Sequence, residues 1–199
     1  MRLFSIATER RGFHWPLRRR NYGFGRNPNR GRSWTLLGLF GFAVACATSA
    51  AADNFDKARR AYDAREYALA GRMFTNLAAT GNARAQTYLG YMYATGTGVP
   101  QNFKVAAGWY RCASQQGIPQ AQYMLGLMYD KGQGVSQDYV VAYALLDLAV
   151  AGAGPERERW VLVRDAVASK LSLIERNRAQ QLAFEAPPGG PCLPISTGN

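Results

Sequence analysis

Few side chains in this sequence could carry out acid–base, nucleophilic or metal chemistry. The only histidine, His14, lies in a basic N-terminal segment, so the chain without that segment has no imidazole to act as a general base or a metal ligand. Acidic residues such as Asp130, Asp138 and Asp147 stand alone, where helix caps and solvated helix faces are expected. We therefore predict no catalytic residue, no metal site and no cofactor, and we expect the protein not to be an enzyme.

The three cysteines are Cys46, Cys112 and Cys192, and none belongs to the C-x-x-C pair typical of zinc or redox sites. Cys112 falls in a predicted helix, and Cys192 falls in a predicted flexible tail at 185–199 that is rich in proline and glycine. In an oxidising compartment the two could form a disulfide that ties this tail to the fold. The alternative is a small buried hydrophobic residue at Cys112 and a free thiol at Cys192. The sequence leaves both open.

The basic charge of the chain is concentrated at its N-terminus. The formal net charge is +11, and residues 1–52 hold nine arginines and one acidic residue, against 15 basic and 12 acidic residues in the rest of the chain. The part that carries the hydrophobic periodicity is therefore only mildly basic, with both signs interspersed. This distribution is typical of a solvated surface, and we predict no nucleic-acid partner.

Residues 1–52 have the organisation of an export signal. Arginines precede an apolar run at 34–44, which is short for a membrane span, and small residues follow it and end at Ala52. We predict a signal peptide or basic leader at 1–52, and hence a bacterial protein exported to the periplasm or cell envelope. Two alternatives remain: lipidation of Cys46, since residues 43–46 resemble a bacterial lipoprotein signal, and an uncleaved anchor at 34–52.

A repeat of 36 residues organises the rest of the chain. Residues 85–93 and 121–129 align at that offset. The same offset relates identical residues further along: Gly96 and Gly132, Gly98 and Gly134, Val99 and Val135, Gln101 and Gln137, Ala106 and Ala142, and Ala113 and Ala149. Each unit reads as two helices joined by a glycine-containing turn, with apolar residues at helical spacing. A hairpin of this kind cannot bury its apolar face alone, so neighbouring units must stack.

Gly90 and Gly126 lie at equivalent positions inside the first helix of their units. A glycine inside a helix costs about 1 kcal/mol relative to alanine. A glycine repeated at that cost predicts that a neighbouring helix packs directly on the backbone there.

The pattern A-x-x-x-L-G-x-x-Y-x-x-G-x-G-V, followed by A-x-x-W-Y-x-x-A and a final G, closely resembles the Sel-like repeat branch of the tetratricopeptide-repeat superfamily. The resemblance implies an all-α, right-handed α-solenoid of antiparallel helix pairs, with units at about 53–82, 83–118 and 119–154. The first unit is more divergent. Residues 155–184 resemble the helix pair that closes many bacterial members, so we expect a C-terminal helical cap there.

The resemblance also implies a function: such repeats typically act as adaptors that hold a protein or peptide in a concave groove lined by the first helix of each unit. The predicted groove residues are Arg84, Thr87, Tyr91, Gln120, Tyr123 and Leu127. The tyrosines would give a partner a large contact area, although they could equally pack between adjacent helices. For Arg84 and Gln120, plain solvent exposure is the favoured interpretation.

Two other functions are compatible with the resemblance. One is a periplasmic enzyme acting on cell-wall or β-lactam substrates, an activity assigned to some secreted members that carry a cysteine pair in each repeat. Only Cys112 lies within the repeats of this chain, and that departure argues against the activity. The other is an envelope structural component held at the membrane through Cys46 or residues 34–52.

Overall fold

The computed structural model describes residues 54–185, which consist of helices and turns without a strand. A first helix covers residues 54–63. The helices that follow are α2 (Tyr67–Ala79), α3 (Ala83–Thr95), α4 (Phe103–Gln115), α5 (Pro119–Lys131), α6 (Tyr139–Ala151), α7 (Arg157–Ala168) and α8 (Leu173–Glu185). The predicted leader at 1–52 and the cysteines Cys46 and Cys192 lie outside the described residues.

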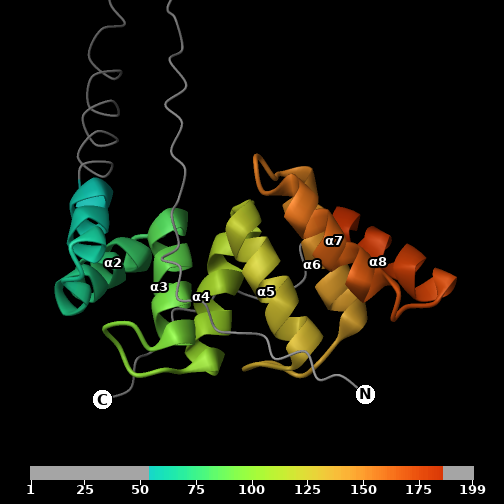
Figure 1. Cartoon of the computed structure of the whole chain (residues 1–199), viewed down its shortest axis with the longest axis horizontal. Coiled ribbons are helices and arrows are strands. Elements are labelled where there is room, and N and C mark those ends of the chain that lie inside the picture. The colour runs from blue at the N-terminus through green and yellow to red at the C-terminus, as the bar shows by residue number, and fades with distance from the viewer. Residues whose placement is uncertain (1–53, 186–199) are drawn as a thin grey trace, which may run out of the picture. The chain divides into compact units, whose positions relative to one another are not determined.

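Each helix from α2 to α6 packs on the next one along the chain, and α7 and α8 both pack on α6 (Figure 1). Helix pairs thus follow one another from α2 to the closing pair α7 and α8, so the predicted all-α solenoid is confirmed. In the part of the chain that is described, no helix is both long enough and apolar enough to span a membrane.

Clusters of the hydrophobic core draw on neighbouring units. One buried cluster joins Tyr110 of α4, Leu125 of α5 and Leu145 of α6, so it draws on two neighbouring units. An earlier cluster joins Phe55 and Phe74 of the first unit to residues of α3 and α4 in the same way. No helix pair closes its core alone, which is why the units must stack.

The two helical glycines lie where a neighbouring helix approaches most closely, as predicted. A Cβ atom on Gly90 would be 2.7 Å from ring atoms of Tyr110 in α4. A Cβ atom on Gly126 would be 2.9 Å from Cγ of Leu146 in α6. Tyr110 and Leu146 are equivalent positions in successive units, so leucine fills the place of the usual aromatic residue, and it is fully buried there.

The turn inside each of the two regular units packs on the unit before it. Gly98 has a φ of +73°, and a Cβ there would be 2.6 Å from Cβ of Tyr67, the first residue of α2. Gly134 has a φ of +71° and lies against the backbone of Phe103, the first residue of α4. The same contact therefore recurs after one repeat length, between a turn and the preceding second helix.

Side-chain caps mark the start of three helices. Asn82, Asn102 and Asp138 accept hydrogen bonds from the backbone N–H groups of Ala85, Val105 and Val141, at 3.0, 3.1 and 3.0 Å. Each bond satisfies one of the free N–H groups in the first turn of a helix. These caps fix where α3, α4 and α6 begin, and therefore the lengths of the turns that precede them.

The first unit has a shorter turn than the other two. Only residues 64–66 separate its two helices, whereas residues 96–102 separate α3 from α4. Arg65 occupies the left-handed region in this short turn, with a φ of 64°. The first helix consequently does not align with α3 at the 36-residue offset that relates α3 to α5.

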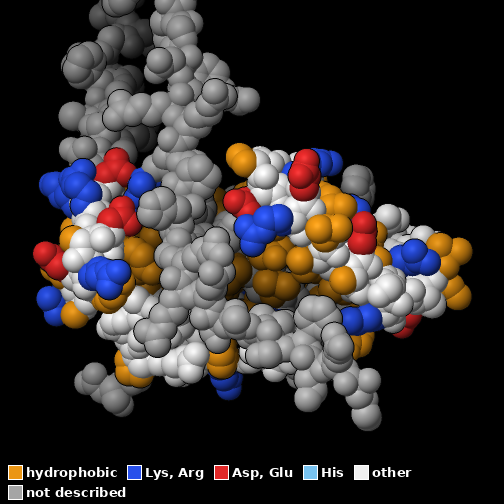
Figure 2. Space-filling model, in the orientation of Figure 1, with side chains coloured by type: hydrophobic (Ala, Val, Ile, Leu, Met, Phe, Trp, Pro, Cys, Tyr) orange, Lys and Arg blue, Asp and Glu red, His pale blue; other side chains and the backbone are white. Residues whose placement is uncertain are grey.

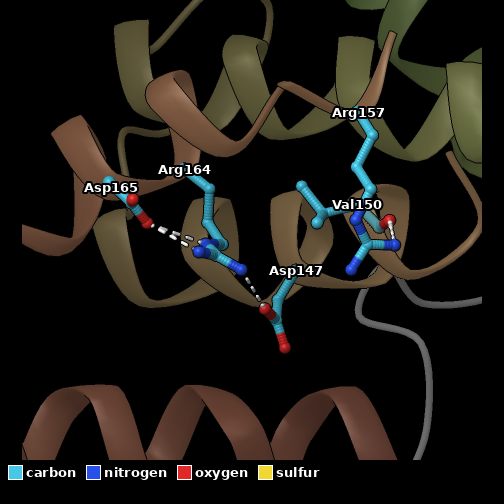
Figure 3. A network of polar contacts seen from close by, with 5 residues as sticks. All are labelled: Asp147, Val150, Arg157, Arg164 and Asp165. Atoms are coloured by element: carbon cyan, nitrogen blue, oxygen red, sulfur yellow. Dashed lines mark hydrogen bonds and ion pairs between the residues drawn. The ribbon is translucent and has the colours of Figure 1, made fainter. Parts of the chain in front are cut away.

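Polar contacts hold α7 on α6 (Figure 3). Arg164 of α7 donates to Asp147 of α6 at 3.2 Å and to its own neighbour Asp165 at 2.8 Å. Arg157 donates to the backbone carbonyl of Val150 at 3.1 Å. In this arrangement the closing helices are bound to the last repeat by charge-assisted bonds as well as by apolar packing.

A capping box formed by Ser172 and Glu175 starts α8. The backbone N–H of Ser172 donates to the Glu175 carboxylate at 2.8 Å, and the N–H of Glu175 donates to the Ser172 hydroxyl at 3.3 Å. The Ser172 hydroxyl also donates to the Glu175 carboxylate at 2.7 Å, and this bond, together with the one from the Ser172 N–H, lowers the pKa of Glu175 below its usual value.

Acid is therefore expected to loosen α8 before the rest of the fold. A carboxylate whose pKa is lowered on folding contributes stability above its unfolded pKa, and that stability is lost as the pH falls below about 4. The protection factors of the amides in α8, which correct for the pH dependence of intrinsic exchange, should fall with acidification in the native chain and change less in Glu175→Gln, which keeps a neutral capping partner. An equal fall in both proteins would contradict this role of Glu175.

Candidate partner-binding surface

The first helices of successive units form one side of the fold, which we call the first-helix row: residues 54–63, α3, α5 and α7. Side chains connect neighbouring members of this row. Tyr88 of α3 packs edge-on against Phe55, with ring centroids 5.7 Å apart. Tyr123 of α5 stacks on Trp160 of α7, with centroids 4.8 Å apart and an interplanar angle of 14°. Ring contacts therefore join the first two members of the row and the last two. Helix-pair solenoids present surfaces of this kind to partners.

The three predicted groove residues of α3 differ in exposure. Arg84 is exposed, and its guanidinium carbon lies 4.0 Å from the centre of the Phe55 ring. Thr87 is only 6% exposed, and its hydroxyl donates to the carbonyl of Ala83 at 2.9 Å. Tyr91 is half-buried and packs against the core cluster of the middle unit. Arg84 is thus the most accessible of the three, and Thr87 serves packing.

The three predicted residues of α5, Gln120, Tyr123 and Leu127, are all half-buried. Because Tyr123 stacks on Trp160, its ring connects two helices of the fold, which is the packing alternative weighed above. Burial raises the pKa of Tyr123. The six predicted residues thus lie on two neighbouring members of the row, and their binding of a partner stays a prediction.

An aromatic cluster lies at the N-terminal end of the row. Tyr88 stacks on Phe74 of α2 with centroids 4.7 Å apart, and it meets Phe55 and Tyr62 of the first helix edge-on. Burial raises the pKa of Tyr88, and the nearby guanidinium groups of Arg59 and Arg84 oppose that rise. Both arginines therefore act electrostatically on the same hydroxyl, although they belong to different units.

The two arginines have different partners. Arg59 lies 3.6 Å from Asp63, one helical turn further along, and the Asp63 side chain is 61% exposed. Arg84 has no hydrogen bond or ion pair to any residue within 54–185. Within these residues, its guanidinium makes a cation–π contact with the Phe55 ring. Figure 2 shows Lys and Arg side chains over the first helix and α2. Sequence reasoning missed Arg59, whose charge looked like an ordinary solvated one.

Glutamines at equivalent positions also turn out to be structural. Gln86 and Gln122 donate to the carbonyls of Ala78 and Ser114 in the preceding second helices, at 3.2 and 3.4 Å. Gln101 donates to the carbonyl of Ala94 at 2.9 Å, and its equivalent Gln137 donates to that of Asp130 at 2.7 Å. Their recurrence after 36 residues was the signal in the sequence for these bonds.

Cys112 is buried and disulfide-bonded. Because Cys46 and Cys192 lie outside the described residues, the pairing of Cys112 with Cys192 and the lipidation of Cys46 stay predictions. Residues 54–185 contain no group of three or more His, Cys, Asp or Glu side chains placed to hold a metal ion.

A family model described as the Sel1 repeat matches residues 83–118 and 119–152. Residues 83–152 are two Sel1 repeats. The match begins at the start of α3 and ends just after α6, so it contains both regular Sel1 units. The matched residues are thus a helical repeat scaffold of a type associated with protein interaction.

One of two similar solved structures, the first below, supports the same architecture. The chain is similar to c5321, a protective antigen of uropathogenic Escherichia coli with an SLR fold, at 28% identity and a TM-score of 0.62, over 71% of this chain and 31% of that one. It is also similar to a Sel1 repeat protein from Oxalobacter formigenes, at 34% identity and a TM-score of 0.49, over 52% of this chain and 42% of that one. The chain thus spans less than half the length of either protein. Among curated proteins no match was found.

Proposed function

We propose that the protein is an exported, non-enzymatic scaffold that binds a protein or peptide partner on its first-helix row at the cell envelope. The observation that carries the proposal is the state of Arg84, an exposed cation held over an aromatic ring with no acidic partner in residues 54–185. Isolated exposed aromatics and cations are common, but here they lie on the side that Sel1-type solenoids use for binding. The half-buried Tyr91 extends the same surface along α3.

Site-specific photo-crosslinking tests which side of the fold meets the partner. A photoreactive residue in place of Gln120 or Leu127 samples the first-helix row, and one in place of Arg72 or Lys104 samples exposed positions of α2 and α4. In envelope extracts the first pair should give discrete crosslinked products that the second pair does not. Products that form equally from both pairs, or only from the second, would contradict the proposed surface.

The export part of the proposal rests on the organisation of residues 1–52. Mass spectrometry of the protein purified from its own cells tests it. A new N-terminus at Asp53 supports cleavage and release, a lipidated Cys46 supports anchoring in the envelope, and an intact leader on a cytoplasmic protein overturns export.

A further inference from the structure

Two arginines from neighbouring first helices approach one aromatic surface. Phe55, Arg59 and Asp63 are spaced four residues apart, so they share one face of the first helix. Arg84 and Tyr88 are likewise four apart on α3. The two faces meet, because Arg84 lies over Phe55 and Tyr88 packs against both Phe55 and Tyr62. The result is a cationic and aromatic patch between the first two units.

The guanidinium of Arg84 is positioned over the Phe55 ring but makes no hydrogen bond within residues 54–185. Its contact with the Phe55 ring is made through the π-face at 4.0 Å, and such a contact occupies none of the five N–H donors by itself. No acidic residue among those described pairs with it. A planar, pre-positioned fork of N–H donors is the group best suited to a carboxylate, which it can bind through two parallel hydrogen bonds.

Arg59 is also available to an incoming anion, because its present partner holds it weakly. The Arg59–Asp63 ion pair measures 3.6 Å and joins residues one turn apart on one helix, and the side chains of Arg59 and Asp63 are 25% and 61% exposed. A long pair whose acid lies mostly in solvent contributes little to stability. A carboxylate from a partner can therefore replace Asp63 at small cost.

The surrounding charge has the matching sign. Residues 54–85 contain six basic and three acidic side chains, whereas residues 86–185 contain nine and eight. The excess of positive charge thus lies in the part of the chain that contains the patch. It is too small and local for a nucleic-acid backbone, which requires an extended basic surface.

We propose that the Phe55–Arg59–Arg84–Tyr88 patch binds an acidic segment of the partner, with a carboxylate bound by the guanidinium groups of Arg59 and Arg84 and an apolar side chain against the half-buried Tyr88 ring. This inference deepens the proposed function and rests on it: it assigns the chemical class of the partner and the end of the first-helix row where that partner binds.

Selection from a randomised peptide library displayed on phage tests the inference without a known partner. The full chain is expected to select peptides rich in Asp and Glu next to hydrophobic residues. A selected peptide, made with Gln and Asn in place of its acids, should bind at least about tenfold more weakly. Selected peptides that lack acidic residues but still bind the first-helix row would contradict the proposal that the partner is acidic. They would remain consistent with the scaffold function. No selected peptide at all would count against the scaffold function itself.

Three variants locate the site. Arg59→Gln and Arg84→Gln should each weaken the selected acidic peptide by about tenfold, and Arg72→Gln, an equal loss of charge on the exposed side of α2, should change its affinity about twofold or less. Asp63→Asn removes the competing carboxylate and should strengthen binding. Circular dichroism checks that each variant is folded. Equal losses from Arg72→Gln and Arg84→Gln, or weaker binding in Asp63→Asn, would overturn the site.

Discussion

Gly134→Ala is expected to destabilise the fold more than other single glycine-to-alanine changes in residues 54–185, by about 3 kcal/mol or more. Two effects add at this position. The φ of +71° is unfavourable for a residue with a side chain, and the new Cβ would overlap the carbonyl group of Phe103. A backbone carbonyl at the start of α4 cannot rotate away as a side chain could. The turn would have to separate from the preceding unit.

Urea denaturation followed by circular dichroism measures this loss, and two glycines separate its causes. Gly117 has a similar φ of +75° but no atom near the place of a Cβ, so Gly117→Ala measures the backbone strain alone, about 1–2 kcal/mol. Gly154 has neither feature, and Gly154→Ala should change the unfolding free energy by about 0.5 kcal/mol or less. If Gly134→Ala costs no more than Gly117→Ala, the turn does not hold the preceding unit.

Gly90→Ala is expected to destabilise the fold by about 1–3 kcal/mol, although alanine is the better helix former. The three atoms nearest to the new Cβ all belong to the Tyr110 ring, at 2.7 to 2.9 Å, and that ring is fully buried. A ring in a packed core cannot give way without displacing α4 from α3.

The effect of Gly90→Ala on the free energy of unfolding should change sign when Tyr110 is replaced by alanine. Tyr110→Ala alone is expected to cost about 3–5 kcal/mol through the cavity it leaves. In that background Gly90→Ala meets no ring and gains up to about 1 kcal/mol from its helix propensity. The four proteins form a double-mutant cycle, measured by urea denaturation, whose coupling energy reports the contact. Additive effects would show that Tyr110 does not explain the glycine.

Much of this fold could be predicted because its contacts recur. Gly90 and Gly126 are costly in a helix, and their repetition at one offset indicated that another helix approaches there, which the structure confirms. The capping box at Ser172 was also predictable, since it depends only on residues three apart. Short-range sequence rules and the 36-residue repeat are sufficient to predict features of this kind.

The contacts that could not be predicted from the sequence involve helices that do not follow the 36-residue repeat. Tyr123 stacks on Trp160 of α7, a closing helix without a matching repeat, so no alignment could place that ring opposite it. Arg59 was missed for a related reason. The short turn at 64–66 puts its helix out of register with the others, so no offset relates it to Arg84. Their proximity follows from the way the two helices pack.

The contact between Gly134 and the start of α4 also determines how this chain can change in length. Gly98 makes the same contact with the start of α2, one repeat length earlier. Suppose that a second copy of residues 83–118 were inserted after Ile118. The turn of this copy would pack on the start of α4 in the original unit, and the start of its own second helix would receive the turn that contains Gly134. Duplication of a whole unit preserves every such junction, whereas gain or loss of a few residues in a turn breaks one. The protein can thus lengthen by copying, in steps of one unit.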